Sequence, residues 1–123
     1  MKILIADDSS FVRNVISKAL NTNFSDLEIV TCTDGQEAYN AYLEHQPDLL
    51  ITDLLMPNMT GQDLLRKLKE DHEDVRAIVI SADIQNATRE ELDEIGVVGF
   101  INKPMSPEKF NQLIDLIRGQ ENA

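Results

Sequence analysis

The sequence predicts an α/β fold in which a five-stranded parallel sheet carries helices on both faces. Five short apolar runs alternate along the chain with segments whose apolar residues recur at helical spacing. The third run is apolar at nearly every position, as in a strand that is buried on both faces. Short connections between alternating strands and helices imply right-handed crossovers and a doubly wound, three-layer sandwich. The length of 123 residues suits one such domain.

Each predicted strand is a short run that ends at polar or turn-forming residues. The runs lie at residues 3–6, 27–33, 49–52, 77–80 and 97–101. The second run alternates in part between apolar and polar residues, which favours a place at the edge of the sheet. The fifth is interrupted by Gly99.

Helices are predicted between the strands from capping residues and apolar faces. In the first helix a serine at position 9 or 10 is the cap, and the apolar face ends near residue 21. The second helix opens at Asp34 and Gly35 and stops before Pro47. The third follows Gly61 and turns its leucines inward.

The last two helices differ in how much apolar surface they bring to the core. The fourth, at residues 88–95, has few apolar residues and many acids. The fifth starts with Pro107 at its first position, after a serine cap, and ends near Gly119. We therefore expect a single domain over residues 1–119, a loose tail over residues 120–123 and no effector domain.

The composition restricts the possible functions of the protein and its possible location in the cell. The chain carries a formal net charge of −11, which repels nucleic acid and favours a divalent cation or a basic partner. The single cysteine, Cys32, excludes an internal disulfide and a cysteine metal cluster, and it fits a reducing compartment. The apolar start of the chain is too short for a signal peptide, and no segment is long enough to insert into a membrane. We therefore expect a cytoplasmic protein.

Polar side chains follow four of the predicted strands. Asp7 and Asp8 end the first strand, Asp53 follows the third, Ser81 follows the fourth, and Lys103 comes shortly after the fifth. The carboxyl ends of parallel strands meet at one edge of the sheet, where open α/β folds place their ligands. We expect these five side chains to meet in one crevice.

The residue types in this crevice point to phosphoryl and cation chemistry. Three carboxylates in a small space cannot all stay ionised unless a cation compensates or one pKa rises. Oxygen ligands without histidine or cysteine suit a hard cation such as Mg²⁺. A carboxylate can also be a nucleophile toward phosphorus and form an aspartyl-phosphate. Lys103 would supply positive charge, and Ser81 a hydroxyl donor, to the transferred group.

Several short motifs resemble a known family. They are Asp7-Asp8, the pattern from Asp53 through Met56-Pro57 and Met59 to Gly61, Ser81-Ala82, Phe100 and Lys103-Pro104. Together they closely resemble the receiver domain of two-component response regulators, and the resemblance extends from Lys2 to Arg118. The opening Asp-Asp-Ser-Ser-Phe-Val-Arg is similar to the single-domain chemotaxis (CheY-like) branch. The resemblance implies a flavodoxin-like sheet in the order 2-1-3-4-5.

The resemblance also implies a role for each site residue. Asp53 would be the phospho-acceptor, and Asp7, Asp8, Asp53 and the backbone carbonyl of Leu55 would hold Mg²⁺. The phosphoryl oxygens would be bound by Ser81 and Lys103, and the peptide bond between Lys103 and Pro104 would be cis. Phe100 would turn inward when Ser81 is drawn toward the phosphoryl group.

The partners implied by the resemblance are proteins of a signalling pathway. The phosphoryl donor would be a phosphohistidine on a sensor histidine kinase, or a small acyl phosphate. An output protein or a phosphatase would bind the face formed by the fourth helix, the fifth strand and the fifth helix. The weakly anchored fourth helix would be easy to shift by a change in populations. The expected function is a phosphorelay response regulator in chemotaxis or motility signalling, which catalyses only its own phosphorylation and dephosphorylation.

Two positions would tune the lifetime of the phosphoryl group, and a third bears on partner contacts. Leu55 stands two residues after Asp53, where the chemotaxis type has a polar side chain, and Asp83 follows Ser81 by two, where an acid is expected. A bulky apolar side chain over the acyl phosphate would hinder the attacking water, so we expect slow self-hydrolysis. Phe100 lacks the hydroxyl of the tyrosine often found at its position, so partner contacts through that hydroxyl are not expected.

Simpler roles for the same residues stay open at this stage. Asp7 and Asp8 could cap the first helix, and Asp53 could be an ordinary turn residue. Ser81 could bond only to backbone, and Phe100 could be a core aromatic. The joint pattern, rather than any single residue, is what is specific.

Other functions compete with the expected one. Within the family, the output could be binding to a flagellar switch, action as a phosphate sink, or relay to a histidine phosphotransfer protein. A Mg²⁺-dependent phosphatase of the haloacid dehalogenase type would carry a second aspartate at the position of Leu55. A nucleotide or flavin binder would need a glycine-rich turn after the first strand, where the sequence is Asp-Asp-Ser-Ser.

Overall fold

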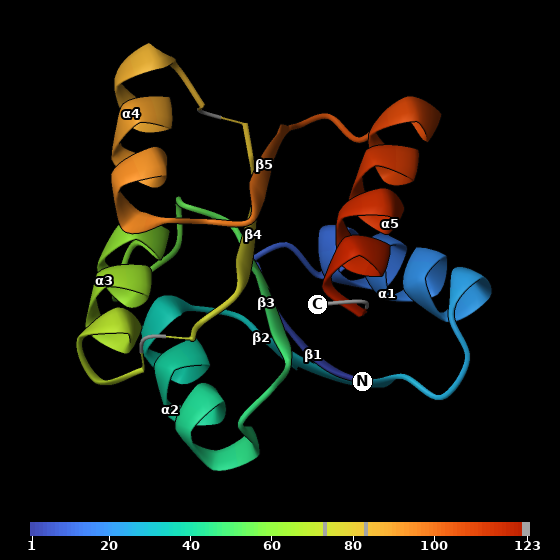
Figure 1. Cartoon of the computed structure of the whole chain (residues 1–123), viewed down its shortest axis with the longest axis horizontal. Coiled ribbons are helices and arrows are strands. Elements are labelled where there is room, and N and C mark those ends of the chain that lie inside the picture. The colour runs from blue at the N-terminus through green and yellow to red at the C-terminus, as the bar shows by residue number, and fades with distance from the viewer. Residues whose placement is uncertain (73, 83, 122–123) are drawn as a thin grey trace.

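The structure, a computed structural model, describes residues 1–72, 74–82 and 84–121. Five strands form one parallel sheet (Figure 1). They are β1 (Lys2–Ala6), β2 (Glu28–Cys32), β3 (Leu49–Thr52), β4 (Ala77–Ser81) and β5 (Gly99–Asn102). Their order in the sheet is β2-β1-β3-β4-β5, with every neighbouring pair parallel. The fold class and the strand order are confirmed, and β2 lies at an edge as its alternating pattern predicted.

The helices cover both faces of the sheet. Figure 1 shows α1 (Ser10–Asn23) and α5 (Pro107–Glu121) on one side. On the other side lie α2 (Gly35–His45), α3 (Gly61–Asp71) and α4 (Asn86–Ile95). Across the described residues, no helix has both the length and the apolar character needed to span a bilayer.

Alternation along the central strands builds two apolar layers. In β3, Leu49 and Ile51 pack into the layer under α1 and α5, whereas Leu50 packs into the layer under α2, α3 and α4. All four β3 residues are buried. Because successive side chains point to opposite faces, a strand covered on both sides must be apolar at nearly every position. The continuous apolar runs therefore identify the central strands. Polar side chains that could act chemically are confined to the ends of these strands.

Side-chain caps set the beginnings of four helices, among them α5, where the Ser106 hydroxyl accepts from the Lys109 amide at 3.3 Å. The Ser9 hydroxyl accepts a hydrogen bond from the Val12 amide at 3.3 Å, and Asp34 accepts from the Glu37 amide at 2.7 Å. The Thr60 hydroxyl caps α3 in the same way. Helix α4 has no capping hydrogen bond from its N-cap side chain, and Leu92 is the one fully buried residue in it. The apolar anchoring of α4 is therefore weak, as its composition predicted.

Several boundaries differ from the expected ones: α1 ends at Asn23 rather than near residue 21, and several strand ends move by one residue. Helix α4 starts at residue 86 rather than 88. Strand β5 starts at Gly99, which pairs with Ile78 instead of interrupting the strand. A Cβ on Gly99 would lie 2.8 Å from the Leu116 side chain, so the glycine lets α5 approach the strand. Helix α5 continues past Gly119 to Glu121, because a single helical glycine costs only about 1 kcal/mol. Of the expected loose tail, positions 120 and 121 are therefore helical, and 122–123 lie outside the described residues.

Candidate functional site

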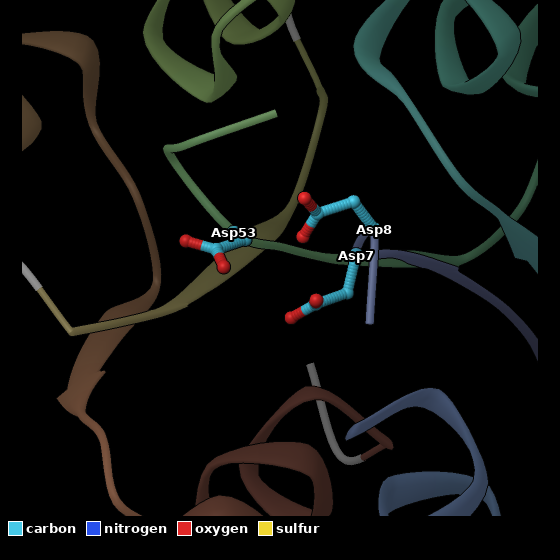
Figure 2. A group of neighbouring side chains, drawn as sticks. All are labelled: Asp7, Asp8 and Asp53. Atoms are coloured by element: carbon cyan, nitrogen blue, oxygen red, sulfur yellow. The ribbon is translucent and has the colours of Figure 1, made fainter. Parts of the chain in front are cut away.

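Three carboxylates gather at the carboxyl edge of the sheet (Figure 2). Asp7 and Asp8 follow β1 and Asp53 follows β3; one oxygen of each lies within 4.8 Å of the other two. The Asp7 amide donates to the carbonyl of Cys32 at 3.1 Å, and the Asp53 amide donates to the carbonyl of Ala6 at 3.0 Å. These bonds continue the parallel ladders beyond the strands and fix both backbones. Asp7 is 2 % exposed and Asp53 is 7 % exposed, whereas Asp8 is open to solvent.

Lys103 joins two of these carboxylates. Its Nζ lies 2.8 Å from Asp53 Oδ2 and 2.9 Å from Asp7 Oδ2. The Lys103 amide donates to the carbonyl of Ser81 at 2.9 Å, which ties the loop after β5 to the end of β4. The peptide bond between Lys103 and Pro104 is cis. The structure thus brings residues 96 positions apart into direct contact, as the convergence of strand ends required.

The turn after β3 holds the other oxygen of Asp53. Asp53 Oδ1 accepts hydrogen bonds from the amides of Leu54, at 2.6 Å, and Leu55, at 3.3 Å. The turn is closed by the Gly61 amide, which donates to the Leu54 carbonyl at 2.9 Å. A Cβ on Gly61 would collide with the carbonyl oxygen of Asp53, so only glycine allows α3 to begin this close to the site. Both oxygens of Asp53 are therefore oriented by the protein.

The electrostatics of the crevice reflect burial and crowding. Burial raises the pKa of the Asp7 carboxyl, although the hydrogen bonds from Lys103 and from the Ser9 amide oppose this effect. Burial also disfavours the charge on Lys103, but hydrogen bonds to Asp53 and Asp7 outweigh it and raise the pKa of the ammonium. Three carboxylates against one ammonium leave a formal charge of −2. This all-oxygen donor set, with a net negative charge, fits a hard divalent cation.

Ser81 and Phe100 lie on the same face of the sheet. Phe100 pairs with Val79 across the strands, and Ser81 is two residues beyond Val79 on β4. Ser81 is fully buried, and its Oγ has no hydrogen-bond partner among the described residues. The half-buried ring of Phe100 packs against the layer under α2, α3 and α4, with the guanidinium carbon of Arg89 at 5.4 Å from the ring centroid.

Large apolar side chains flank the acidic crevice. Leu55, two residues after Asp53, is 60 % exposed, and Phe11, three residues after Asp8, is 75 % exposed. The expected tuning role of Leu55 stays a prediction. The other expected tuning residue, Asp83, lies outside the described residues.

Comparison with protein families assigns the chain to a class. The family model "Response regulator receiver domain" matches residues 3–115, which is nearly the whole length of the described chain. The chain belongs to the response regulator receiver domain family. The resemblance drawn from its sequence motifs is thereby confirmed.

Receiver domains of diverse proteins are similar to this one. The chemotaxis protein CheY of Bacillus subtilis (strain 168) is 32 % identical over 114 residues, covering 93 % of this chain and 94 % of that protein. A probable transcriptional regulator of Guillardia theta is 30 % identical over 98 % of this chain, but only 46 % of that protein is covered. The chain therefore spans about half or less of the length of several relatives it matches.

Solved structures agree with the fold. The response regulator domain of Thermotoga maritima CheB is 29 % identical, with a TM-score of 0.88 over 100 % of this chain and 97 % of that one. A CheX-CheY complex with BeF3 and Mg²⁺ from Borrelia burgdorferi is 26 % identical, with a TM-score of 0.87 over 97 % of this chain and 87 % of that one. Receiver domains that act in different proteins thus share this arrangement of strands and helices.

Two basic side chains that support the receiver site were not predicted from the sequence. Arg13 Nη1 donates to the carbonyl of Asp7 at 2.7 Å, and Lys109 Nζ donates to the carbonyl of Asn102 at 2.6 Å. Both bind a backbone carbonyl at the end of a strand. The sequence signal was weak, since a basic residue on a helix most often points into solvent. Helix packing, which brings these side chains over the strand ends, is what reveals them.

Proposed function

We propose that this receiver domain accepts a phosphoryl group on Asp53 from a phosphohistidine of a sensor histidine kinase. The main support is the contact of the Asp53 carboxylate with Lys103 at 2.8 Å beside two further carboxylates. In the step, an Asp53 oxygen forms a bond to phosphorus while the bond from phosphorus to the histidine nitrogen breaks. The electron pair stays on the imidazole, and the product is an aspartyl-phosphate.

The residues around Asp53 fit a Mg²⁺ site. Asp7, Asp8, Asp53 and the backbone carbonyl of Leu55 are the proposed ligands, and the all-oxygen set with its formal charge of −2 supports this choice. When bound, the ion supplies positive charge that offsets the charge of the transferring phosphoryl group. Of the three carboxylate ligands Asp8 is the exposed one, so it offers the path by which the ion enters.

The proposed phosphoryl contacts come from Lys103 and Ser81. The Lys103 ammonium is already beside the acceptor oxygen, where it lowers the energy of a developing negative charge. The Ser81 hydroxyl is buried and lacks a partner among the described residues, so a phosphoryl oxygen would satisfy it. Because Phe100 lies on the same face of the sheet, a shift of Ser81 would make room for the ring to turn inward.

The output surface is proposed to consist of α4, β5 and α5. The weak apolar anchoring of α4 supports this choice, because phosphorylation then needs little energy to shift its position. The resemblance over almost the full length of B. subtilis CheY supports a role in chemotaxis signalling. A phosphate sink and a relay intermediate are the alternative outputs. The one cysteine of the sequence, Cys32, is a buried free thiol, which fits a reducing cytoplasmic location.

Two measurements test this function. Incubation with acetyl phosphate and Mg²⁺ should add one phosphoryl group by intact mass to the protein and to the control variant Asp26→Asn, but none to Asp53→Asn. Partner capture should then depend on beryllofluoride with Mg²⁺, and Asp53→Asn should abolish that dependence. Labelling that persists in Asp53→Asn would overturn the acceptor assignment. Partner capture that is equal with and without beryllofluoride, and equal in the wild type and Asp53→Asn, would overturn the switched output.

A further inference from the structure

An apolar groove of about 500 Å³ opens beside the proposed phosphorylation site. It lies between α1, the loop after β5 and the start of α5, and its walls include Phe11, Val12, Val15, Met105 and Phe110. Lys103, whose ammonium contacts Asp53, also lines it. The groove is therefore continuous with the acceptor carboxylate through a single side chain.

The lining defines what the groove could hold. Among the described residues that form it, Lys103 is the one that carries a charge, and the other walls are hydrocarbon or thioether. Because that ammonium is already paired with Asp7 and Asp53, an anionic ligand end at Lys103 also needs the proposed Mg²⁺ to offset the carboxylates, and the rest of a complementary ligand is apolar. Phe11 lines the groove and is 75 % exposed, which makes it the most exposed of the three large apolar side chains that the described part of the chain leaves open to solvent.

We propose that this groove binds the acyl group of a small acyl phosphate, and that among small-molecule donors it favours those with a longer hydrocarbon acyl chain. The inference rests on the proposed acceptor role of Asp53. With the phosphoryl end at Asp53 and Lys103, the acyl chain extends over Phe11 and Val15. An Asp53 oxygen bonds to phosphorus, the bond from phosphorus to the acyl oxygen breaks, and the carboxylate leaves with the electron pair, so no proton or redox partner is needed.

The expected effect follows from the area that the acyl chain buries. Burial of one methylene changes a binding constant about fourfold, so butyryl phosphate gains on the order of tenfold over acetyl phosphate. Phosphorylation rates of the full chain are measured by intact mass with Mg²⁺, at donor concentrations far below saturation. The quantity compared among proteins is the ratio of the butyryl to the acetyl rate, because the intrinsic reactivity of each donor then cancels.

Variants at the groove should lower this ratio. We expect a drop of about fivefold in Phe11→Ala, whose side chain is too exposed to be needed for folding, and a similar drop in Val15→Thr. Leu43→Ala is the matched control, because Leu43 is another exposed large apolar residue but lies on α2, away from the groove. Butylphosphonate, which transfers no phosphoryl group, should compete with acetyl phosphate more strongly than methylphosphonate does, and Phe11→Ala should remove the difference.

The outcomes separate the two proposals. A ratio that is equal in the wild type, Phe11→Ala and Val15→Thr would overturn the groove assignment while leaving Asp53 as the acceptor. A ratio that falls equally in Leu43→Ala would overturn it as well, since the effect would then not come from the groove. Failure of every donor to label Asp53 would overturn the proposed function itself.

Discussion

The ammonium of Lys103 lies 2.8 Å from Asp53 Oδ2, and the same nitrogen lies 2.9 Å from Asp7 Oδ2. One cation therefore serves two nearly buried carboxylates that come from different strands. The partial compensation keeps the crevice folded, yet it leaves a net negative charge that a divalent cation can offset.

Removal of the Asp7 charge should stabilise the metal-free protein. Burial raises the pKa of Asp7, so the folded chain disfavours the ionised carboxyl. In Asp7→Asn, Lys103 keeps its contact with Asp53 and the Ser9 amide keeps an acceptor. We expect the free energy of unfolding at pH 7, with a chelator present, to rise on the order of 1 kcal/mol, or roughly 4 °C in Tm.

The pH dependence of the same variant gives a sharper test. A group with a raised pKa contributes stability that is full below its unfolded pKa, near 3.9, and is lost as the pH rises through its folded pKa. The stability of the wild type relative to Asp7→Asn should therefore fall from pH 3.5 toward neutral pH. A wild type whose stability rises relative to that of Asp7→Asn over this pH range would contradict the prediction. Asp26→Asn, in an exposed loop, serves as the control.

Mg²⁺ should stabilise the protein through the acidic cluster. At 100 times its dissociation constant, an ion that binds only the folded chain adds about 2.7 kcal/mol to the free energy of unfolding. Thermal unfolding with and without Mg²⁺ should show this gain in the wild type and its loss in Asp8→Asn, whose exposed side chain is not needed for packing. An equal gain in both proteins would remove Asp8 from the ligand set. A chelator should also abolish labelling by acetyl phosphate.

Ser81→Ala should keep the stability of the fold but weaken the binding of a phosphoryl mimic. The buried Ser81 hydroxyl has no partner among the described residues, and an unsatisfied buried polar group costs about 1–3 kcal/mol. Urea unfolding of the unphosphorylated variant should therefore show unchanged or increased stability. Its affinity for beryllofluoride with Mg²⁺ should fall about tenfold, because a hydrogen bond to an anionic oxygen is lost. A destabilised variant with normal affinity would show that the hydroxyl serves the fold alone.

Leu55→Asn should shorten the lifetime of the phosphorylated protein. Leu55 is 60 % exposed and its amide contacts Asp53, so we expect its side chain to lie on the path of water to the acyl phosphate. An amide at this position can orient the attacking water through one hydrogen bond, which corresponds to an acceleration of about fivefold. The decay of phosphoprotein is followed after removal of the donor, with Leu43→Asn as the matched control. Decay that is unchanged or slower in Leu55→Asn refutes the role of Leu55.

The sequence predicted the architecture closely but not every boundary. Apolar runs and caps such as Asp34 depend on neighbouring residues, so local patterns were enough to find them. The start of β5 depends instead on pairing with Ile78 and on the approach of Leu116 to Gly99, which involve distant segments. Likewise, Gly61 was expected only to precede the third helix, whereas its closeness to the Asp53 carbonyl shows that it also shapes the crevice.

By itself, the sequence determined which residues could carry the chemistry. The order of buried strands placed Asp7, Asp8 and Asp53 at strand ends, because parallel strands must present the same ends at one edge. Tertiary structure alone decided how they are paired: that Lys103 binds both Asp7 and Asp53, that Ser81 lacks a partner among the described residues, and that an apolar groove adjoins the site. These features depend on distances between segments far apart in the chain, which only packing of the helices on the sheet can set.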